Sequence, residues 1–237
     1  RFILWAFVLF CGSSLFAQNT YTSAKDSDAK SVVALNKIKA KYSTAGQQIT
    51  SVFTMKIDLP NQAARLEKGT MIQSGNKFNL SMKDMAIISD GKTVWFINKK
   101  QKEVQINDYS KDVSQGMVNP AEFIMQYSPK SFISAVTFDG PKNGKKVMVM
   151  EIKSVDRKVD YSKVRVTVNK ATNELMEMEL FNKDGSRYTL NVSKTTFSKT
   201  TSSSSFGFDK SKYPGFNVED LRVNWNAING GRNEDPF

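Results

Sequence analysis

The stretch that most constrains the fold of this chain covers residues 77–107. It has the pattern of strand, turn, strand, turn, strand, with its sharpest corner at residues 89–92. Asp90 and Gly91 suit a tight turn, because Asp bonds its own backbone and Gly accepts a positive φ. Before the corner, polar residues alternate with an apolar set, which is Phe78, Leu80 and Met82. After the corner, residues 94–97 are apolar on both faces, so this strand must be covered on both sides.

The first seventeen residues have the layout of a secretory signal. Residues 2–10 form an apolar run, which is shorter than the ~20 residues that a membrane span needs. The alternatives are a buried N-terminal element and acylation of Cys11, but Phe10 stands where lipoprotein processing wants a small residue. We therefore expect a signal peptide over residues 1–17, cleaved after Ala17, and export across the inner membrane.

The remainder of the chain fits one all-β domain, since such domains run to ~200–250 residues. We expect a flexible leader at residues 18–26, the domain at 27–222 and a flexible C-terminal tail at 223–237. The only cysteine, Cys11, leaves with the signal, so the mature chain has no disulfide.

The net charge of +11 would suit nucleic acid, an anionic membrane or an acidic partner. However, the lysines are scattered singly through turns and polar strand faces, with no run of five or more. This distribution favours a solvated basic surface. We therefore expect no nucleic-acid partner.

Two helices and about eleven strands are predicted. A helix over residues 28–42, capped by Asp26 or Ser27, has an apolar stripe opposite a lysine-rich face. A short helix over residues 121–127 begins after Asn119 and Pro120. Short turns between strands indicate antiparallel hairpins, and the strands outside the opening stretch are expected at residues 48–59, 63–73, 132–139, 145–154, 163–169, 174–182 and 186–197.

A long antiparallel sheet of this size curls toward a barrel, and the striped helices need an apolar surface to cover. We expect a mostly β fold with α: an incomplete antiparallel β-barrel of about eleven strands, closed by two or three helices and enclosing a hydrophobic cavity. One face of the Trp95 strand would look into the barrel, and helix or loop would cover the other. Residues 206–222, which are rich in aromatics, are expected to dock back onto the body after a polar connector at 198–205.

Residues typical of catalytic and metal sites are scarce. The chain has no histidine, which excludes histidine bases and histidine metal ligands, and no Gly-rich loop opens a helix. Glu177 and Glu179 share one face of a strand, where they are typical of a solvent-facing side. We expect no catalytic residue, no metal and no cofactor, with a hydrolase acting on a bound lipid ester as an alternative class.

Methionine is frequent on the predicted strands. It fills irregular space and adapts to variable ligands, and the residues concerned are Met55, Met71, Met82, Met148, Met150, Met176 and Met178. Two interpretations stay open: an ordinary β core that uses methionine, and a lipid-binding cavity.

The order of elements, with residues 88–96 at its centre, resembles the LolA-type outer-membrane lipoprotein carriers of Gram-negative bacteria. So do residues 69–71 followed by 76–78, the hairpin at 184–188 and the ending at 206–222. The resemblance implies a monomeric periplasmic protein whose half-barrel encloses a hydrophobic cavity. Its members take acylated lipoproteins from an inner-membrane lipoprotein-releasing ABC transporter and hand them to an outer-membrane acceptor or membrane. The alternative is a membrane-anchored lipoprotein acceptor or envelope-stress sensor with the same half-barrel, which requires an acylated Cys11.

Family members carry an arginine on the strand before the Phe78 position that helps to hold a closed lid, whereas residues 74–76 of this chain contain none. By strand parity and motif position, the strands are predicted to line the cavity with Phe53, Met55, Phe78, Leu80, Met82 and Trp95. The two helices that act as the lid are predicted to add Leu35, Ile38, Phe123 and Ile124.

Overall fold

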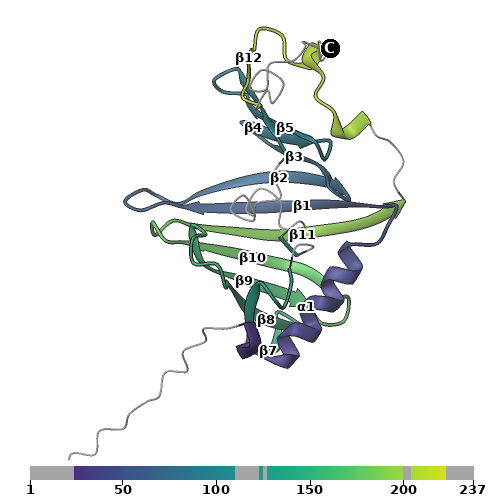
Figure 1. Ribbon diagram of the computed structural model, residues 1–237, viewed down its shortest axis with the longest axis vertical. Coiled ribbons are helices and arrows are strands. Elements are labelled where there is room, and N and C mark those ends of the chain that lie inside the picture. Colours follow the sequence, from purple (N-terminus) through teal and green to yellow (C-terminus); the bar gives the residue numbers. More distant parts are fainter. Residues whose placement is uncertain (1–23, 110–122, 125–126, 200–203, 223–237) are drawn as a thin grey trace, which may run out of the picture.

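A computed structural model describes residues 24–109, 123–124, 127–199 and 204–222 of the chain. Twelve strands form one sheet in the order β12-β6-β5-β4-β3-β2-β1-β11-β10-β9-β8-β7. The sheet therefore begins and ends at different strands and stays open, as an incomplete barrel (Figure 1). Its strands are β1 (Gln47–Asp58), β2 (Arg65–Ser74), β3 (Lys77–Met82), β4 (Met85–Ser89), β5 (Thr93–Asn98), β6 (Glu103–Asp108), β7 (Phe132–Lys142), β8 (Lys145–Ser154), β9 (Tyr161–Asn169), β10 (Glu174–Asn182), β11 (Arg187–Lys199) and β12 (Asn217–Asp220).

The predicted fold class is confirmed, and the opening stretch differs in one detail. It contains four strands, β3 to β6, in place of three. The extra reversal lies at Lys83 and Asp84, where the Asp84 carbonyl accepts a 2.9 Å hydrogen bond from the Lys99 amide in the turn between β5 and β6. The four-residue β12, which pairs with β6 in parallel, was also not predicted, because so short a strand shows no period of its own.

Helix α1 (Ala29–Tyr42) begins one or two residues later than the predicted caps imply. Its cap is Asp28, whose side chain accepts a 2.9 Å bond from the Lys30 amide. Ser27 instead bonds the edge strand β7, where its hydroxyl accepts from the Ser134 amide at 3.1 Å. The other carboxylate oxygen of Asp28 accepts from the Val136 amide at 3.2 Å. The start of α1 is thereby fastened to β7.

Several predicted segments fall outside the described residues: the signal peptide, most of the leader, the tail from residue 223, and the start of the second helix at Asn119 and Pro120. Of that second helix, only residues 123 and 124 are described as helical. Within the described ranges, no helix is long and apolar enough to span a membrane.

One face of the sheet, called here the inner face, carries two adjoining apolar clusters. The α1 cluster joins the underside of α1 to β7–β10 and includes Leu35, Ile38, Tyr42, Ile49, Phe123, Ile124, Tyr127, Phe132, Met148, Met150, Ile152, Tyr161, Val164, Val166, Val168, Leu175, Met178 and Leu180. The β1–β5 cluster includes Phe53, Met55, Ile57, Met71, Phe78, Leu80, Met82, Ile87, Val94 and Leu190. Tyr188 and Val192 on β11 pack against both clusters, so the apolar surface is continuous along the inner face.

The opposite, outer face of β4–β6 carries a third cluster, made of Ala86, Ile88, Ile97 and Val104. The segment near the C-terminus packs on it, as expected: Trp95 stacks on Phe208 at 6.2 Å between ring centroids, and Phe208 stacks on Tyr213 at 5.4 Å. Strand β5 is therefore covered on both sides, because Val94 and Phe96 lie with the inner cluster. This resolves the doubly apolar pattern of residues 94–97.

Gly69 marks the tightest backbone approach on the inner face. It pairs with Phe53 across β1 and β2, and a Cβ at this position would lie 2.4 Å from Phe53 Cζ and 2.9 Å from Met82 Cγ. We expect Gly69→Ala to lower the free energy of unfolding in urea by about 1–3 kcal/mol, since the packed ring must move. Adding Phe53→Leu should relieve part of the crowding introduced by the alanine. Gly207→Ala is the control, because a Cβ there meets nothing within 4 Å; equal losses at both glycines would contradict the prediction.

Candidate functional site

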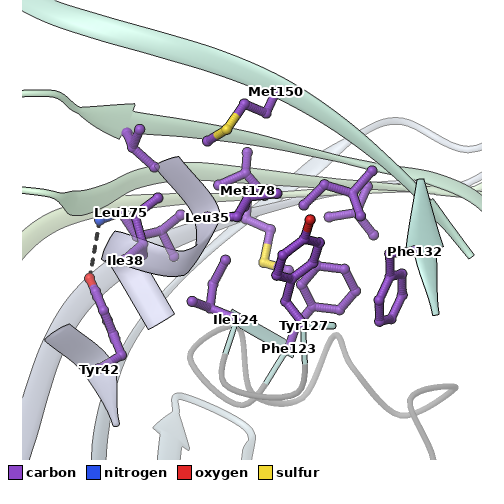
Figure 2. Close-up of a cluster of buried hydrophobic side chains, with 14 of the residues drawn as sticks. Leu35, Ile38, Tyr42, Phe123, Ile124, Tyr127, Phe132, Met150, Leu175 and Met178 are labelled. Carbon is purple, nitrogen blue, oxygen red and sulfur yellow. Dashed lines mark hydrogen bonds between the residues drawn. The ribbon is translucent and has the colours of Figure 1, made fainter. Parts of the chain in front are cut away.

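The candidate site is the inner face where α1 crosses it. Leu35, Ile38 and Tyr42 recur along one side of the helix and are at most 4% exposed. They meet methionines and branched side chains of β8–β10, with Phe123, Ile124 and Tyr127 closing another side (Figure 2). Methionine side chains are flexible and can adapt to ligands of different shape. The branched side chains are stiffer and keep the rest of the surface fixed.

Hydroxyl groups of serine and tyrosine also lie inside this apolar region. Ser31 on α1 and Ser134 on β7 are hydrogen-bonded at 2.7 Å, and the Tyr127 hydroxyl lies 3.2 Å from Ser134. Tyr42 accepts a 3.1 Å bond from the Leu175 amide (Figure 2). Burial raises the pKa of Tyr42 and of Tyr127, so both phenols are neutral near pH 7 and add no charge to the apolar surface.

The structure brings nine of the ten predicted lining residues to the inner face, in two groups. Leu35, Ile38, Phe123 and Ile124 lie in the α1 cluster. Phe53, Met55, Phe78, Leu80 and Met82 lie in the β1–β5 cluster. Each of them is at most 6% exposed, which places them where a cavity lining would lie.

Trp95 is a correction. It lies on the outer face, where it packs with Phe208, Tyr213 and Phe216, while its neighbours Val94 and Phe96 face inward. Successive residues of a strand point to opposite faces, and a strand that is apolar on both faces gives no polar residue by which to tell them apart. Parity counted through such a strand therefore does not identify the inner side.

Polar groups along the exposed edges of α1 hold it against the body. Lys41 pairs with Glu174 on β10 at 2.7 Å, and Lys39 donates to the Tyr127 carbonyl at 2.7 Å. Near the other end of α1, Lys30 forms an ion pair with Asp139 on β7. Ser74, at the place of the family arginine, donates to the Gln47 carbonyl at 3.1 Å. Lysines of α1 thus form ion pairs and hydrogen bonds to the sheet that the sequence pattern alone did not reveal.

Two of the hollows formed by the described residues lie beside α1 and beside β4–β6. One, of about 470 Å³, lies along the flank of α1 and is lined by Ala29, Lys30, Val33, Ala34, Lys37, Ile38, Met148, Val168, Lys170 and Asn173. The other, of about 490 Å³, lies beside β4–β6, where Met85, Ile87 and Phe96 meet charged residues that include Arg65, Glu67 and Lys100. Of the predicted lining residues only Ile38 borders either hollow. The predicted lining left out β8 and β9, although the methionines of β8 are among those that suggest a lipid-binding cavity.

The acidic residues considered for catalysis lie on the outer face of β10. Glu179 is paired with Arg165 at 2.9 Å, and Thr167 donates to Glu177 at 3.5 Å. Arg165 also bonds Glu151 at 2.7 Å, so the carboxylates belong to a charged network across β8–β10. Among the described residues, no group of three or more histidine, cysteine, aspartate or glutamate side chains could hold a metal ion.

An open antiparallel half-barrel whose apolar inner face lies under a helix defines the carrier class of binding fold. The family model of the outer membrane lipoprotein carrier protein LolA matches residues 46–209. The chain belongs to the LolA family.

One solved structure supports this fold, and two others are similar to the chain at lower TM-scores. An uncharacterized conserved protein from Thermus thermophilus is similar over 81% of this chain and 99% of its own, with a TM-score of 0.51 and 8% identity. A putative outer membrane lipoprotein-sorting protein domain from Vibrio parahaemolyticus covers 75% of this chain and 96% of its own, with a TM-score of 0.45 and 15% identity. A LolA superfamily protein from Nitrosomonas europaea covers 76% and 98%, with a TM-score of 0.41 and 14% identity. A search of the curated proteins finds no match.

Proposed function

We propose that this protein is a periplasmic carrier, with residues 27–222 as its carrier domain. It binds the acyl chains of outer-membrane lipoproteins on the inner face and shuttles them from an inner-membrane lipoprotein-releasing ABC transporter to an outer-membrane acceptor or membrane. The observation that supports this most is the continuous apolar inner face under α1, in a chain of the lipoprotein carrier family.

Binding of an acyl chain beneath α1 requires the side chains there to move. The buried residues of the α1 cluster are at most 8% exposed, so their side chains already fill the space beneath the helix. An acyl chain then enters by displacing α1 or by replacing side-chain contacts. The inner-face residues, including Leu35, Ile38, Phe53 and Leu80, are the surface that we assign to the acyl chains.

The free-energy cost of uncovering the inner face is similar to the gain from burying an acyl chain. Exposing Leu35, Ile38 and Tyr42 costs about 1.5–3 kcal/mol for each side chain. Burying about six to eleven CH₂ groups at ~0.8 kcal/mol each offsets that cost. The lysine pairs of α1 lie at its partly exposed edges, where ion pairs contribute little to stability. A long acyl chain can therefore displace the helix on binding and leave again on release.

Recovery of the cargo tests the proposal directly. The full chain is expressed with its N-terminal segment in a Gram-negative host, isolated from the periplasm without detergent, and examined by native mass spectrometry for bound acylated protein. A carrier is expected to co-purify with intact lipoprotein and to deliver it to outer-membrane vesicles. Purification without any acylated protein, together with failure to accept one in vitro, contradicts the proposal. Cleavage of an added lipid ester by the purified protein would instead indicate a hydrolase.

The mature N-terminus separates the carrier from the membrane-anchored acceptor or sensor. A carrier is expected to begin at Gln18, which intact-mass measurement and N-terminal peptide mapping would identify. A lipidated Cys11 would instead indicate the anchored alternative.

A further inference from the structure

We infer that the hollow along the flank of α1 binds a free long-chain fatty acid, with its carboxylate held by lysines at the mouth. The floor is apolar, since Ala34, Ile38, Met148 and Val168 all border the hollow. Its volume of about 470 Å³ falls within the ~300–1,000 Å³ typical of small-molecule sites. This site goes beyond the proposed function, because its ligand is a free amphiphile in place of a protein-linked acyl chain.

Positive charges outnumber negative charges around the hollow. Lys30, Lys37 and Lys170 line it, whereas Asp139 is the carboxylate that pairs with two of them, Lys170 at 2.5 Å and Lys30 at closer range. The cap residue Asp28 also acts on Lys30. Hydrogen bonds from Lys170 and then Lys30 lower the pKa of Asp139, so this carboxylate is ionised near neutral pH. The pair of lysines around it already has the geometry that one carboxylate needs, and Lys37 adds a third positive charge beside the same mouth.

An amphiphile is the occupant that matches both features. A neutral chain would use the floor and leave the lysines without a new partner, and a small anion would leave the apolar floor in water. A fatty acid satisfies both, since its chain lies on Ile38, Met148 and Val168 while its carboxylate competes with Asp139 for Lys30 and Lys170. Val33, which lines the hollow and is 54% exposed, lies within reach of an incoming chain.

Substitutions at the mouth test the charge selectivity. Palmitate and monopalmitoylglycerol are titrated into the full chain below their aggregation concentrations, and binding is followed by calorimetry. We expect palmitate to bind more tightly, Lys170→Gln to weaken palmitate about three- to fivefold, and Asp139→Asn to strengthen it by a similar factor. Monopalmitoylglycerol should respond to neither change. Lys68→Gln, an exposed lysine on β2, is the matched control.

The two mouth variants separate binding from folding, because both remove the Lys170–Asp139 ion pair and a merely structural role would move palmitate affinity in the same direction in both. Val33→Glu and Val33→Lys provide a second pair: each places a charge on the same exposed position, and we expect opposite effects on palmitate. Equal binding of palmitate and monopalmitoylglycerol, or weaker palmitate binding in Asp139→Asn, overturns the inference. Tighter binding of palmitoyl lysophosphatidate than of palmitate overturns it in favour of a phosphate headgroup. Lipoprotein transfer is measured separately, so loss of transfer with palmitate selectivity intact counts against the carrier function alone.

Discussion

A disulfide between positions 31 and 134 is expected to stop acyl-chain exchange without disrupting the fold. The hydroxyls of Ser31 on α1 and Ser134 on β7 are 2.7 Å apart and both side chains are buried. Replacing both with cysteine, in a background with Cys11→Ser, places two thiols at a spacing suited to a bond. The positions are 103 residues apart, and closing a loop of that length stabilises the folded state by about 4.7 kcal/mol in the chain-entropy account.

The measurement compares oxidised and reduced forms of the same protein. Uptake and release of a fluorescent acyl chain should be slowed strongly in the oxidised form and should recover on reduction, because the helix can then move away from β7. Each single-cysteine variant, treated with the same oxidant, controls for oxidation elsewhere. If the cross-linked protein exchanges acyl chains as fast as its reduced form, cargo does not enter beneath α1.

Leu80→Ala is expected to destabilise the fold strongly and to leave room for an acyl chain. Leu80 is 2% exposed within the β1–β5 cluster, and truncation of such a leucine costs about 2–5 kcal/mol of unfolding free energy. The residual hollow is apolar, so an acyl chain should enter it. An acyl probe at about 100 times its dissociation constant would then restore ~2.7 kcal/mol by mass action.

Thermal and urea unfolding with and without the probe check this result. Leu66→Ala is the matched control, because the same side chain is removed from a position that is 71% exposed, where surface changes stay within about 0.5 kcal/mol. The lining assignment of Leu80 is contradicted if the probe binds the wild-type and Leu80→Ala proteins with equal affinity, since a ligand that contacts residue 80 must sense the missing atoms.

The sequence was sufficient for the strands and for most of the inner face, because both depend on local alternation. Predicted and observed strands agree closely: residues 145–154 and 174–182 coincide with β8 and β10. The apolar residues Phe78, Leu80 and Met82 share one face, as their spacing required. The predicted orientation of Trp95 was wrong for a local reason. Both faces of β5 are apolar, and only the packing of residues 206–218 decides which face is outside.

The contacts that hold α1 could not be predicted from the sequence. Lys41 and Glu174 are 133 residues apart, and Lys30 meets Asp139 only because α1 lies across β7. A lysine-rich helix face has the same pattern whether its charges meet water or a distant carboxylate. For the same reason, the hollow bordered by Val33, Met148 and Val168 has no signature in any single segment of the chain.

The two ends of the open sheet explain how an unclosed barrel avoids joining other chains. Exposed edge strands are templates for intermolecular pairing and aggregation. At one end, the four-residue β12 covers β6 and carries Glu219 and Asp220. At the other, Ser27 and Asp28 accept hydrogen bonds from the Ser134 and Val136 amides of β7. With each edge partly occupied by its own chain, the sheet can remain open for a guest while offering little backbone on which a fibril could grow.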